Sequence, residues 1–149
     1  MAFAYSLYIG RITYIKVEAM TGKVPYAQSN DPHALVIVLK DGSKHEAELP
    51  NAKDSNALYE IELSAQSDFK PPLDCTKKKI KRNGVSIEAR GNDGWQIAWI
   101  ETYAMTAKKP MYTRLTADPT FQKWLDGNGA DDYLKHVLTK ARRKKSKKL

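Results

Sequence analysis

Cysteine is nearly absent from this chain of 149 residues. The single cysteine, Cys75, excludes an intramolecular disulfide and a zinc site built from clustered cysteines, and we expect no disulfide-linked partner. No run of eighteen apolar residues occurs, and the N-terminal residues lack the basic segment and unbroken apolar core of a signal peptide. These absences and the length predict one ordinary domain that is cytoplasmic, with peripheral membrane association open to it.

Recognisable catalytic motifs are missing as well. The three histidines, His33, His45 and His136, have no spacing typical of metal ligands. No glycine-rich phosphate loop, nucleophile elbow or paired acid motif occurs. Neither Ser43 nor Cys75 has a recognisable base nearby in the sequence. We therefore expect a protein that is not an enzyme and has no catalytic residues.

Positive charge is concentrated in two places. The net charge is +8, but seven of the 25 basic residues lie in the last eleven positions, which leaves about +1 over residues 1–138. A second cluster occupies residues 77–82. Such clusters favour an anionic partner, and a merely solubilising tail is the alternative. The candidate residues are Lys77, Lys78, Lys79, Lys81, Arg82, Lys140, Arg142, Arg143, Lys144, Lys145, Lys147 and Lys148.

Short extended segments dominate the first two thirds of the chain. Residues 34–40 form an almost continuously apolar run, typical of a buried strand, and Asp41-Gly42 after it predicts a hairpin to the alternating residues 44–50. Asn83-Gly84 predicts a second hairpin, between two short strands within residues 77–90. Further strands are expected over residues 6–20, 57–64 and 95–103.

A helical period is expected near the C-terminus. Asp118-Pro119 is a typical helix start, and Phe121, Trp124 and Leu125 would share one face of a short helix ending at Gly127. A second amphipathic helix is expected after Gly129, with an apolar stripe at Tyr133, Leu134, Val137, Leu138 and Ala141. The domain prediction is a β-sandwich over residues 1–116, a helical extension packed on it over 117–142, and a disordered basic tail over 143–149.

The order of these segments resembles the PLAT (lipoxygenase homology) domain. The matching steps are the Thr21-Gly22 turn, the polar loop KVPYAQSNDPHA, the strand LVIVLKDGS, the strand ALYEIEL, the basic KKKIKRNG and the tryptophan strand GNDGWQIAWIETYA. The resemblance covers about residues 15–103. It departs from the family where Gln28-Ser29-Asn30-Asp31 replaces the usual Ala-Gly-Thr-Asp. The resemblance implies a mainly β fold, an antiparallel β-sandwich, here followed by two short helices.

The resemblance also points to the loops at one end of the sandwich. Some family members place calcium there, which makes Asn30, Asp31, Asn92 and Asp93 the candidate ligands of a Ca²⁺ ion. Ordinary turn chemistry explains the same residues without an ion. The resemblance implies that Trp95 anchors its loop, and strand alternation places Trp95, Ile97 and Trp99 on one face. If exposed, Tyr26 and Trp95 would face a membrane or partner.

Three kinds of binding follow from these observations. The first is a non-catalytic module that docks to an anionic membrane surface, a lipid or a protein partner through the end loops and the basic tail. The second is nonspecific nucleic-acid binding through the lysine and arginine clusters, which contain no aromatic residue for base stacking. The third is a structural interaction subunit that docks through the C-terminal amphipathic helix.

Overall fold

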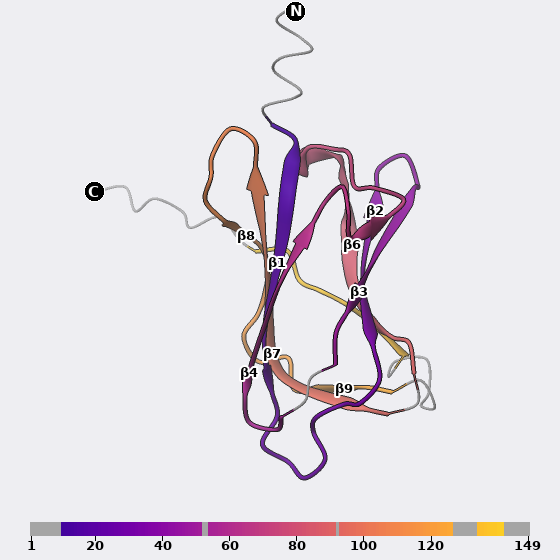
Figure 1. Cartoon of the computed structure of the whole chain (residues 1–149), viewed down its shortest axis with the longest axis vertical. Helices are drawn as coiled ribbons and strands as arrows, with labels where there is room; N and C mark the ends of the chain where they lie inside the picture. The colour runs from indigo at the N-terminus through magenta and orange to yellow at the C-terminus, as the bar shows by residue number, and fades with distance from the viewer. Residues whose placement is uncertain (1–9, 52–53, 92, 127–133, 142–149) are drawn as a thin grey trace, which may run out of the picture.

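Within the described residues, ten strands form two antiparallel sheets that face one another (Figure 1). The computed structural model describes residues 10–51, 54–91, 93–126 and 134–141. The first sheet contains β4 (Leu58–Ser64), β1 (Ile12–Thr21), β7 (Trp95–Thr106) and β8 (Thr113–Asp118) in that order, with β9 (Lys123–Leu125) also paired to β7. The second contains β10 (Lys135–Val137), β6 (Ile80–Ala89), β2 (His33–Leu39), β3 (Lys44–Leu49) and β5 (Phe69–Lys70). The predicted antiparallel β-sandwich is confirmed.

The core lies between the inner faces of the two sheets. Ile15 and Val17 of β1 are fully buried, as are Leu35 and Ile37 of β2. In β1 the buried residues alternate with more exposed ones, as expected for a strand with one inner face. β2 is buried along almost its whole length, which confirms the interpretation of its apolar run. Packing of these apolar side chains between the sheets holds the two layers together.

The two predicted hairpins have different outcomes. β2 and β3 are antiparallel neighbours joined through Asp41-Gly42, where Gly42 has a φ of 89°, so this hairpin is confirmed. The hairpin at Asn83-Gly84 is wrong, because β6 runs through both residues as one strand. Both residues lie in a bulge of that strand.

In strand β7 a second bulge reverses which side chains face the core. Trp95 and Ile97 are fully buried, as the alternation predicts, but the pairing with β1 shifts between Trp99 and Ile97. Beyond the shift Ile100 is fully buried and Trp99 is only half-buried. The prediction that Trp99 shares a face with Trp95 is therefore wrong, since an extra residue in one strand reverses the faces.

Neither predicted C-terminal helix is present in the described residues. In place of the first, β8 extends to Asp118 and β9 pairs with residues Trp95–Ile97 of β7. Where the second helix was expected, the described residues form β10, which pairs with β6. Of the stripe that was expected to be buried, Leu138 is buried, but Leu134 and Val137 are 39% and 48% exposed. Sheet pairing satisfies the backbone of these short segments, and it outweighs their weak helical period.

The segment after β10 crosses from one sheet to the other. The Leu138 amide donates to the Val85 carbonyl of β6 (2.8 Å), and the Ala117 amide of β8 donates to the Thr139 carbonyl (2.9 Å). Ala141 then donates to Leu115 of β8 at 3.2 Å. We call residues 138–141 the C-terminal crossing. It joins β6 to β8, with Leu138 inserted into the core.

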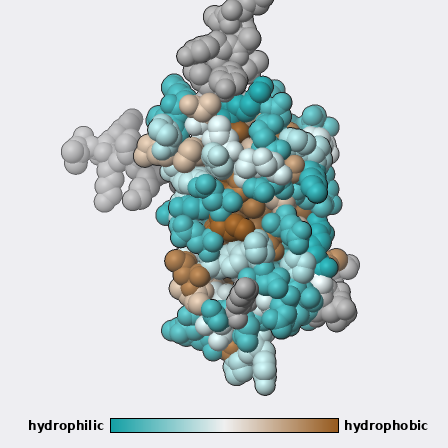
Figure 2. Space-filling view, in the orientation of Figure 1, coloured by the Kyte–Doolittle hydropathy of each residue, from teal (hydrophilic) through white to brown (hydrophobic). Residues whose placement is uncertain are grey.

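The surface seen in Figure 2 is mostly hydrophilic, with an apolar area near its centre, between the two sheets. No helix in the part of the chain that the structure describes has the length and apolar character needed to cross a bilayer.

Candidate functional site

The predicted calcium loops meet at one end of the sandwich and are joined by reciprocal hydrogen bonds. The Asp93 amide donates to Asp31 Oδ2 at 2.8 Å, and the Asn30 amide donates to Asp93 Oδ2 at 2.6 Å. Ser29 Oγ donates to the Asp93 carbonyl at 2.9 Å. Gly91 is needed beside them, because a Cβ there would lie 2.4 Å from the Asp31 Cβ. The two loops that the resemblance places near one another are therefore in contact.

These contacts bear on the calcium prediction. Ca²⁺ takes about six to eight oxygen ligands. Asp31 and Asp93 each use a carboxylate oxygen to accept a main-chain N–H of the facing loop, which is the loop-closing chemistry expected without an ion. Among the described residues no group of three or more His, Cys, Asp or Glu side chains could hold a metal. Asn92 lies outside the described residues. Calcium remains a prediction, and no step of the function proposed here depends on it.

Trp95 anchors the same end of the sandwich from inside. Its side chain is fully buried, and Nε1 donates to Thr21 Oγ1 at 2.9 Å. His33 and Tyr59 pack on the indole, each with its ring centroid 5.0 Å from that of Trp95. Because it is buried, Trp95 cannot touch a membrane or partner, so its place in that predicted set is wrong. Tyr26, the other member, is 82% exposed.

The basic residues of the 77–82 cluster gather elsewhere, around a bulge in β6. Ile80 pairs with Leu39 and Val85 pairs with Ile37, so four residues of β6 lie opposite Val38 alone. Asn83 in this bulge has a φ of 58°. A Cβ on Gly84 would lie 2.5 Å from the Val38 carbonyl oxygen and 2.6 Å from that of Lys81, so only glycine fits.

This bulge forms one side of a groove of about 460 Å³, which we call the basic groove. Its other side comes from Leu115 and Thr116 of β8 and from the C-terminal crossing. Of the described residues, six that line it are cationic and none is acidic. The cationic residues are Lys40, Lys77, Lys78, Lys81, Arg82 and Lys140. Apolar residues complete the lining: Ile80, Val85, Leu115 and Leu138.

The six groove cations form no ion pair within the described residues. The ion pairs found there involve Arg11, Lys16, Lys44, Arg90 and Arg114 instead. Lys77 donates a hydrogen bond to the Thr113 hydroxyl, which is uncharged. Six like charges around one small groove repel one another, which costs stability unless a counter-charge is bound.

The groove unites residues that are distant in the sequence. Of the predicted anionic-partner residues, Lys77, Lys78, Lys81, Arg82 and Lys140 line it. Sequence reasoning missed Lys40, which reaches the groove because the β2–β3 turn lies beside the start of β6. Lys79 lines a neighbouring pocket instead. Arg142, Arg143, Lys144, Lys145, Lys147 and Lys148 lie outside the described residues and follow the crossing directly in the sequence.

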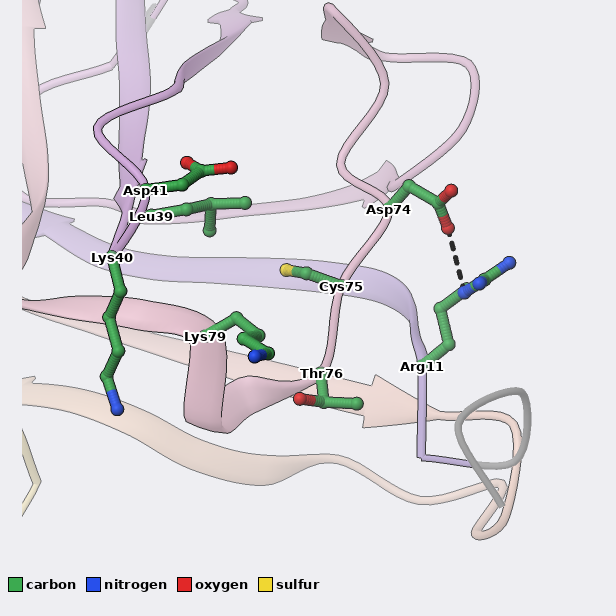
Figure 3. A pocket seen from close by; sticks show the side chains of 8 residues that line it. All are labelled: Arg11, Leu39, Lys40, Asp41, Asp74, Cys75, Thr76 and Lys79. Carbon is green, nitrogen blue, oxygen red and sulfur yellow. Dashed lines mark ion pairs between the residues drawn. The ribbon is translucent and has the colours of Figure 1, made fainter. Parts of the chain in front are cut away.

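The neighbouring pocket, of about 530 Å³, is shown in Figure 3. Arg11 Nε and Asp74 Oδ1 form an ion pair of 2.8 Å at its edge, and the Cys75 side chain points into it. Burial, assisted by the Asp74 and Asp41 carboxylates, raises the pKa of the Cys75 thiol to about 11. The thiol is therefore protonated at neutral pH and is a poor nucleophile.

A serine and a histidine that the sequence analysis left unconnected also meet. Ser43 and His45 are two residues apart in and beside β3, which places them on one face of the strand. Ser43 Oγ lies 3.0 Å from His45 Nε2, and His45 Nδ1 lies 2.9 Å from the Pro71 carbonyl oxygen. Since a carbonyl only accepts, Nδ1 carries the proton and Nε2 accepts from the serine. Neither side chain lines the basic groove or the neighbouring pocket. We therefore interpret the pair as structural, linking β3 to the main chain at Pro71.

The architecture defines a two-layer antiparallel β-sandwich domain with a basic groove beside one edge. No protein-family model and no curated protein sequence matches the chain. Solved structures with a similar fold include the alpha-toxin of Clostridium absonum (TM-score 0.56, 20% identity, 80% of this chain and 30% of that one). A Clostridium perfringens alpha-toxin from an avian strain is also similar (TM-score 0.59, 15% identity, 82% and 31%).

Lipoxygenases are similar in fold too. A calcium-dependent 11R-lipoxygenase aligns with a TM-score of 0.51 at 13% identity, over 86% of this chain and 17% of that one. The chain thus spans less than a third of the length of these structures. At such identities the likeness establishes a shared β-sandwich fold, and it carries no activity to this chain.

Proposed function

We propose that this chain is a PLAT-like, non-catalytic module that docks to an anionic membrane surface. The order of the sequence motifs and the fold shared with lipoxygenases and alpha-toxins support the PLAT-like assignment. The observation that carries the docking function is the basic groove, where six cations gather and no acidic side chain of the described residues lines the site. A cluster of this kind costs stability in the isolated protein, and that cost is recovered when an anionic surface supplies the counter-charge.

The groove and the tail act together in this proposal. Ala141, the last described residue, bonds to Leu115 of the groove wall, and the basic residues from Arg142 onward follow it in the sequence. A basic side chain near an anionic leaflet contributes about 1 kcal/mol. On that scale the six groove residues and the six tail residues together supply several kcal/mol of attraction, so we expect docking without calcium.

Membrane lipid is favoured over nucleic acid by the lining of the groove. Among the described residues no aromatic side chain lines it, so bases have no stacking platform there. Ile80 and Leu115 are partly exposed apolar residues of the lining, and they suit a ligand with hydrocarbon character better than a phosphodiester strand.

Vesicle co-sedimentation of the full chain tests the docking function. We expect binding to vesicles that contain phosphatidylserine, no binding to pure phosphatidylcholine, and no change when calcium is chelated. The triple variant Lys78→Gln, Lys81→Gln, Arg82→Gln should bind about a hundredfold more weakly, at about 1 kcal/mol for each charge removed. The control removes three exposed charges outside the groove, with Lys108→Gln, Lys109→Gln and Lys123→Gln.

A truncation separates the tail from the groove. Ending the chain after Ala141 removes residues 142–149 and keeps the crossing that joins the sheets. We expect weaker binding that still depends on the groove residues. If the full chain does not bind phosphatidylserine vesicles at physiological salt, the proposed docking function is wrong.

A further inference from the structure

Resting on the docking function, we infer that the basic groove is a discrete site for the headgroup of a multiply phosphorylated lipid. The alternative within the same function is diffuse attraction, in which any anionic lipid serves equally. Three properties of the groove separate the two: its size, its charge and the chemistry of its lining.

The size suits one small ligand. A volume of about 460 Å³ falls in the range of about 300 to 1,000 Å³ that is typical of small-molecule sites. The groove has walls on three sides: the β6 bulge, strand β8 and the C-terminal crossing, which is hydrogen-bonded to Val85 of β6 and to β8. Diffuse attraction needs no such enclosure, because cations spread over a flat face achieve it.

The positive charge of the groove indicates how many phosphate groups a matching ligand would carry. A phosphate monoester carries about −1.5 to −2 at neutral pH. The six cations that line the groove therefore match about three such groups on one molecule. Phosphatidylserine offers a single net negative charge per headgroup, so one headgroup in the groove would leave most of the cations unneutralised.

The residues that line the groove offer both the charged and the apolar contacts that such a headgroup needs. Arg82 offers a planar fork suited to two phosphate oxygens, and the five lysines act as point charges. Ile80 and Leu115 are half-buried, while Val85 and Leu138 are nearly fully buried, so these residues form an apolar floor between the cations. The C–H edges of a polyol ring can lie on that floor while its phosphates meet the cations around it.

The bulge explains how β6 supplies two adjacent cations to one site. In a regular strand Lys81 and Arg82 would point to opposite faces of the sheet. The bulge removes residues 81–84 from the regular ladder, and both Lys81 and Arg82 line the groove. Such a bulge is a common device for redirecting side chains toward a site.

Two binding measurements on the full chain test this site. Calorimetry with soluble inositol 1,4,5-trisphosphate, the free form of such a headgroup, should give one-to-one binding. Inorganic phosphate should bind far more weakly. Vesicles with phosphatidylinositol 4,5-bisphosphate should bind more tightly than phosphatidylserine vesicles of equal total charge.

A matched pair of double variants locates the site. Lys81→Gln with Arg82→Gln should weaken trisphosphate binding by at least about tenfold, because each loses a charge-assisted contact. Lys108→Gln with Lys109→Gln, which removes equal charge from exposed residues outside the groove, should change it less than about twofold. Lys108→Gln with Lys109→Gln should leave the thermal melt unchanged, while Lys81→Gln with Arg82→Gln, which relieves repulsion in the groove, should leave the melting temperature unchanged or raise it.

The outcomes that contradict the inference differ from those that contradict docking. If the trisphosphate does not bind and the two vesicle types bind equally, the groove is no headgroup site, while docking by diffuse charge stands. Equal losses in the two double variants lead to the same conclusion. Trisphosphate binding without any vesicle binding would assign the groove to a free polyphosphate, and would overturn both the lipid source and the docking function.

Discussion

Burial keeps the imidazole of His33 neutral. The side chain is 1% exposed, at the end of β2 that packs against Trp95. Desolvation lowers its pKa from 6.5 to about 4, although the nearby main chain of Leu125 and Asp31 and the Asp31 and Asp93 carboxylates act in the opposite direction. A charged imidazole at this position is therefore unfavourable in the folded protein.

The stability of the protein should depend on this histidine between pH 6.5 and 4. In that window the unfolded chain binds a proton at His33 and the folded chain does not, so the free energy of unfolding falls as the pH falls. The shift from 6.5 to about 4 corresponds to a loss of about 3 kcal/mol. Urea denaturation at pH 7, 5.5 and 4 measures this loss.

The variant His33→Gln isolates the contribution of the histidine. It should be less stable at pH 7, because it disturbs the packing on Trp95, but its stability should fall less steeply toward pH 4. Tyr26→Ala, at an exposed position, serves as the control and should keep the original pH dependence. An equally steep fall in His33→Gln would show that other groups cause the acid sensitivity.

The bulge in β6 is the element on which the basic groove depends. It requires a left-handed conformation at Asn83 and a missing Cβ at Gly84. Asparagine adopts positive φ more readily than most residues, and glycine alone avoids the Val38 and Lys81 carbonyl oxygens. These two adjacent residues thus allow β6 to bulge without leaving the sheet.

Adding a methyl group at Gly84 should disturb both the fold and the groove. Gly84→Ala places a Cβ within about 2.6 Å of two backbone oxygens that cannot move freely, so we expect a loss of about 1 to 3 kcal/mol in the free energy of unfolding. Vesicle binding should also weaken, because Lys81 and Arg82 shift with the bulge. Asn83→Gly, which keeps positive φ accessible, should change stability by less than about 1 kcal/mol and preserve binding.

The same dipeptide signal had two outcomes because the sequence does not show what lies opposite it. Asp41-Gly42 lies between two strands that pair with each other, so it becomes a hairpin. Asn83-Gly84 lies opposite Val38 of a strand already in place, so its turn conformation becomes a bulge. Each dipeptide contains one residue with positive φ, Gly42 and Asn83 respectively. Only the tertiary pairing decides which kind of irregularity results.

The C-terminal segment shows the limit of periodicity. The apolar spacing of Phe121, Trp124 and Leu125 fits one helical face, but each of these short segments can instead complete a sheet edge. The strands with which these segments pair, β6 and β7, are distant from them in the sequence, so a local pattern cannot reveal the pairing. The same reason explains the site: the sequence identified the cations of residues 77–82 and the tail, but not the groove that gathers Lys40 and Lys140 with them.

Across the whole molecule, the end loops and the groove cations lie toward different ends of the sandwich. The strand β2 begins at His33, beside the Asp31 and Asp93 loops, and ends at Leu39, which pairs with Ile80 at the start of β6. At about 3.3 Å per residue, the strand separates these positions by roughly 20 Å. In Figure 1 the β1–β2 loop accordingly lies at the bottom and the β2–β3 turn at the top.

This separation predicts that the exposed tip of the β1–β2 loop is not needed for docking. Val24 and Tyr26 are 44% and 82% exposed, and they would be the anchors if the end loops met the membrane. Because a surface that covers the basic groove need not reach that tip, Val24→Ser with Tyr26→Ser should bind phosphatidylserine vesicles within about twofold of the unchanged protein. Raising the salt from 0.1 to 1 M shortens the Debye length from about 10 to 3 Å and should release both proteins.

The opposite result would reverse the orientation of the protein on the membrane. Salt-resistant binding that is lost in the double serine variant would mean that the tip enters the bilayer, with the basic groove directed away from the surface and free for another anionic partner. The groove variants would then bind vesicles normally. Measuring both sets of variants on the same vesicles therefore determines which end of the sandwich meets the lipid, whichever end it is.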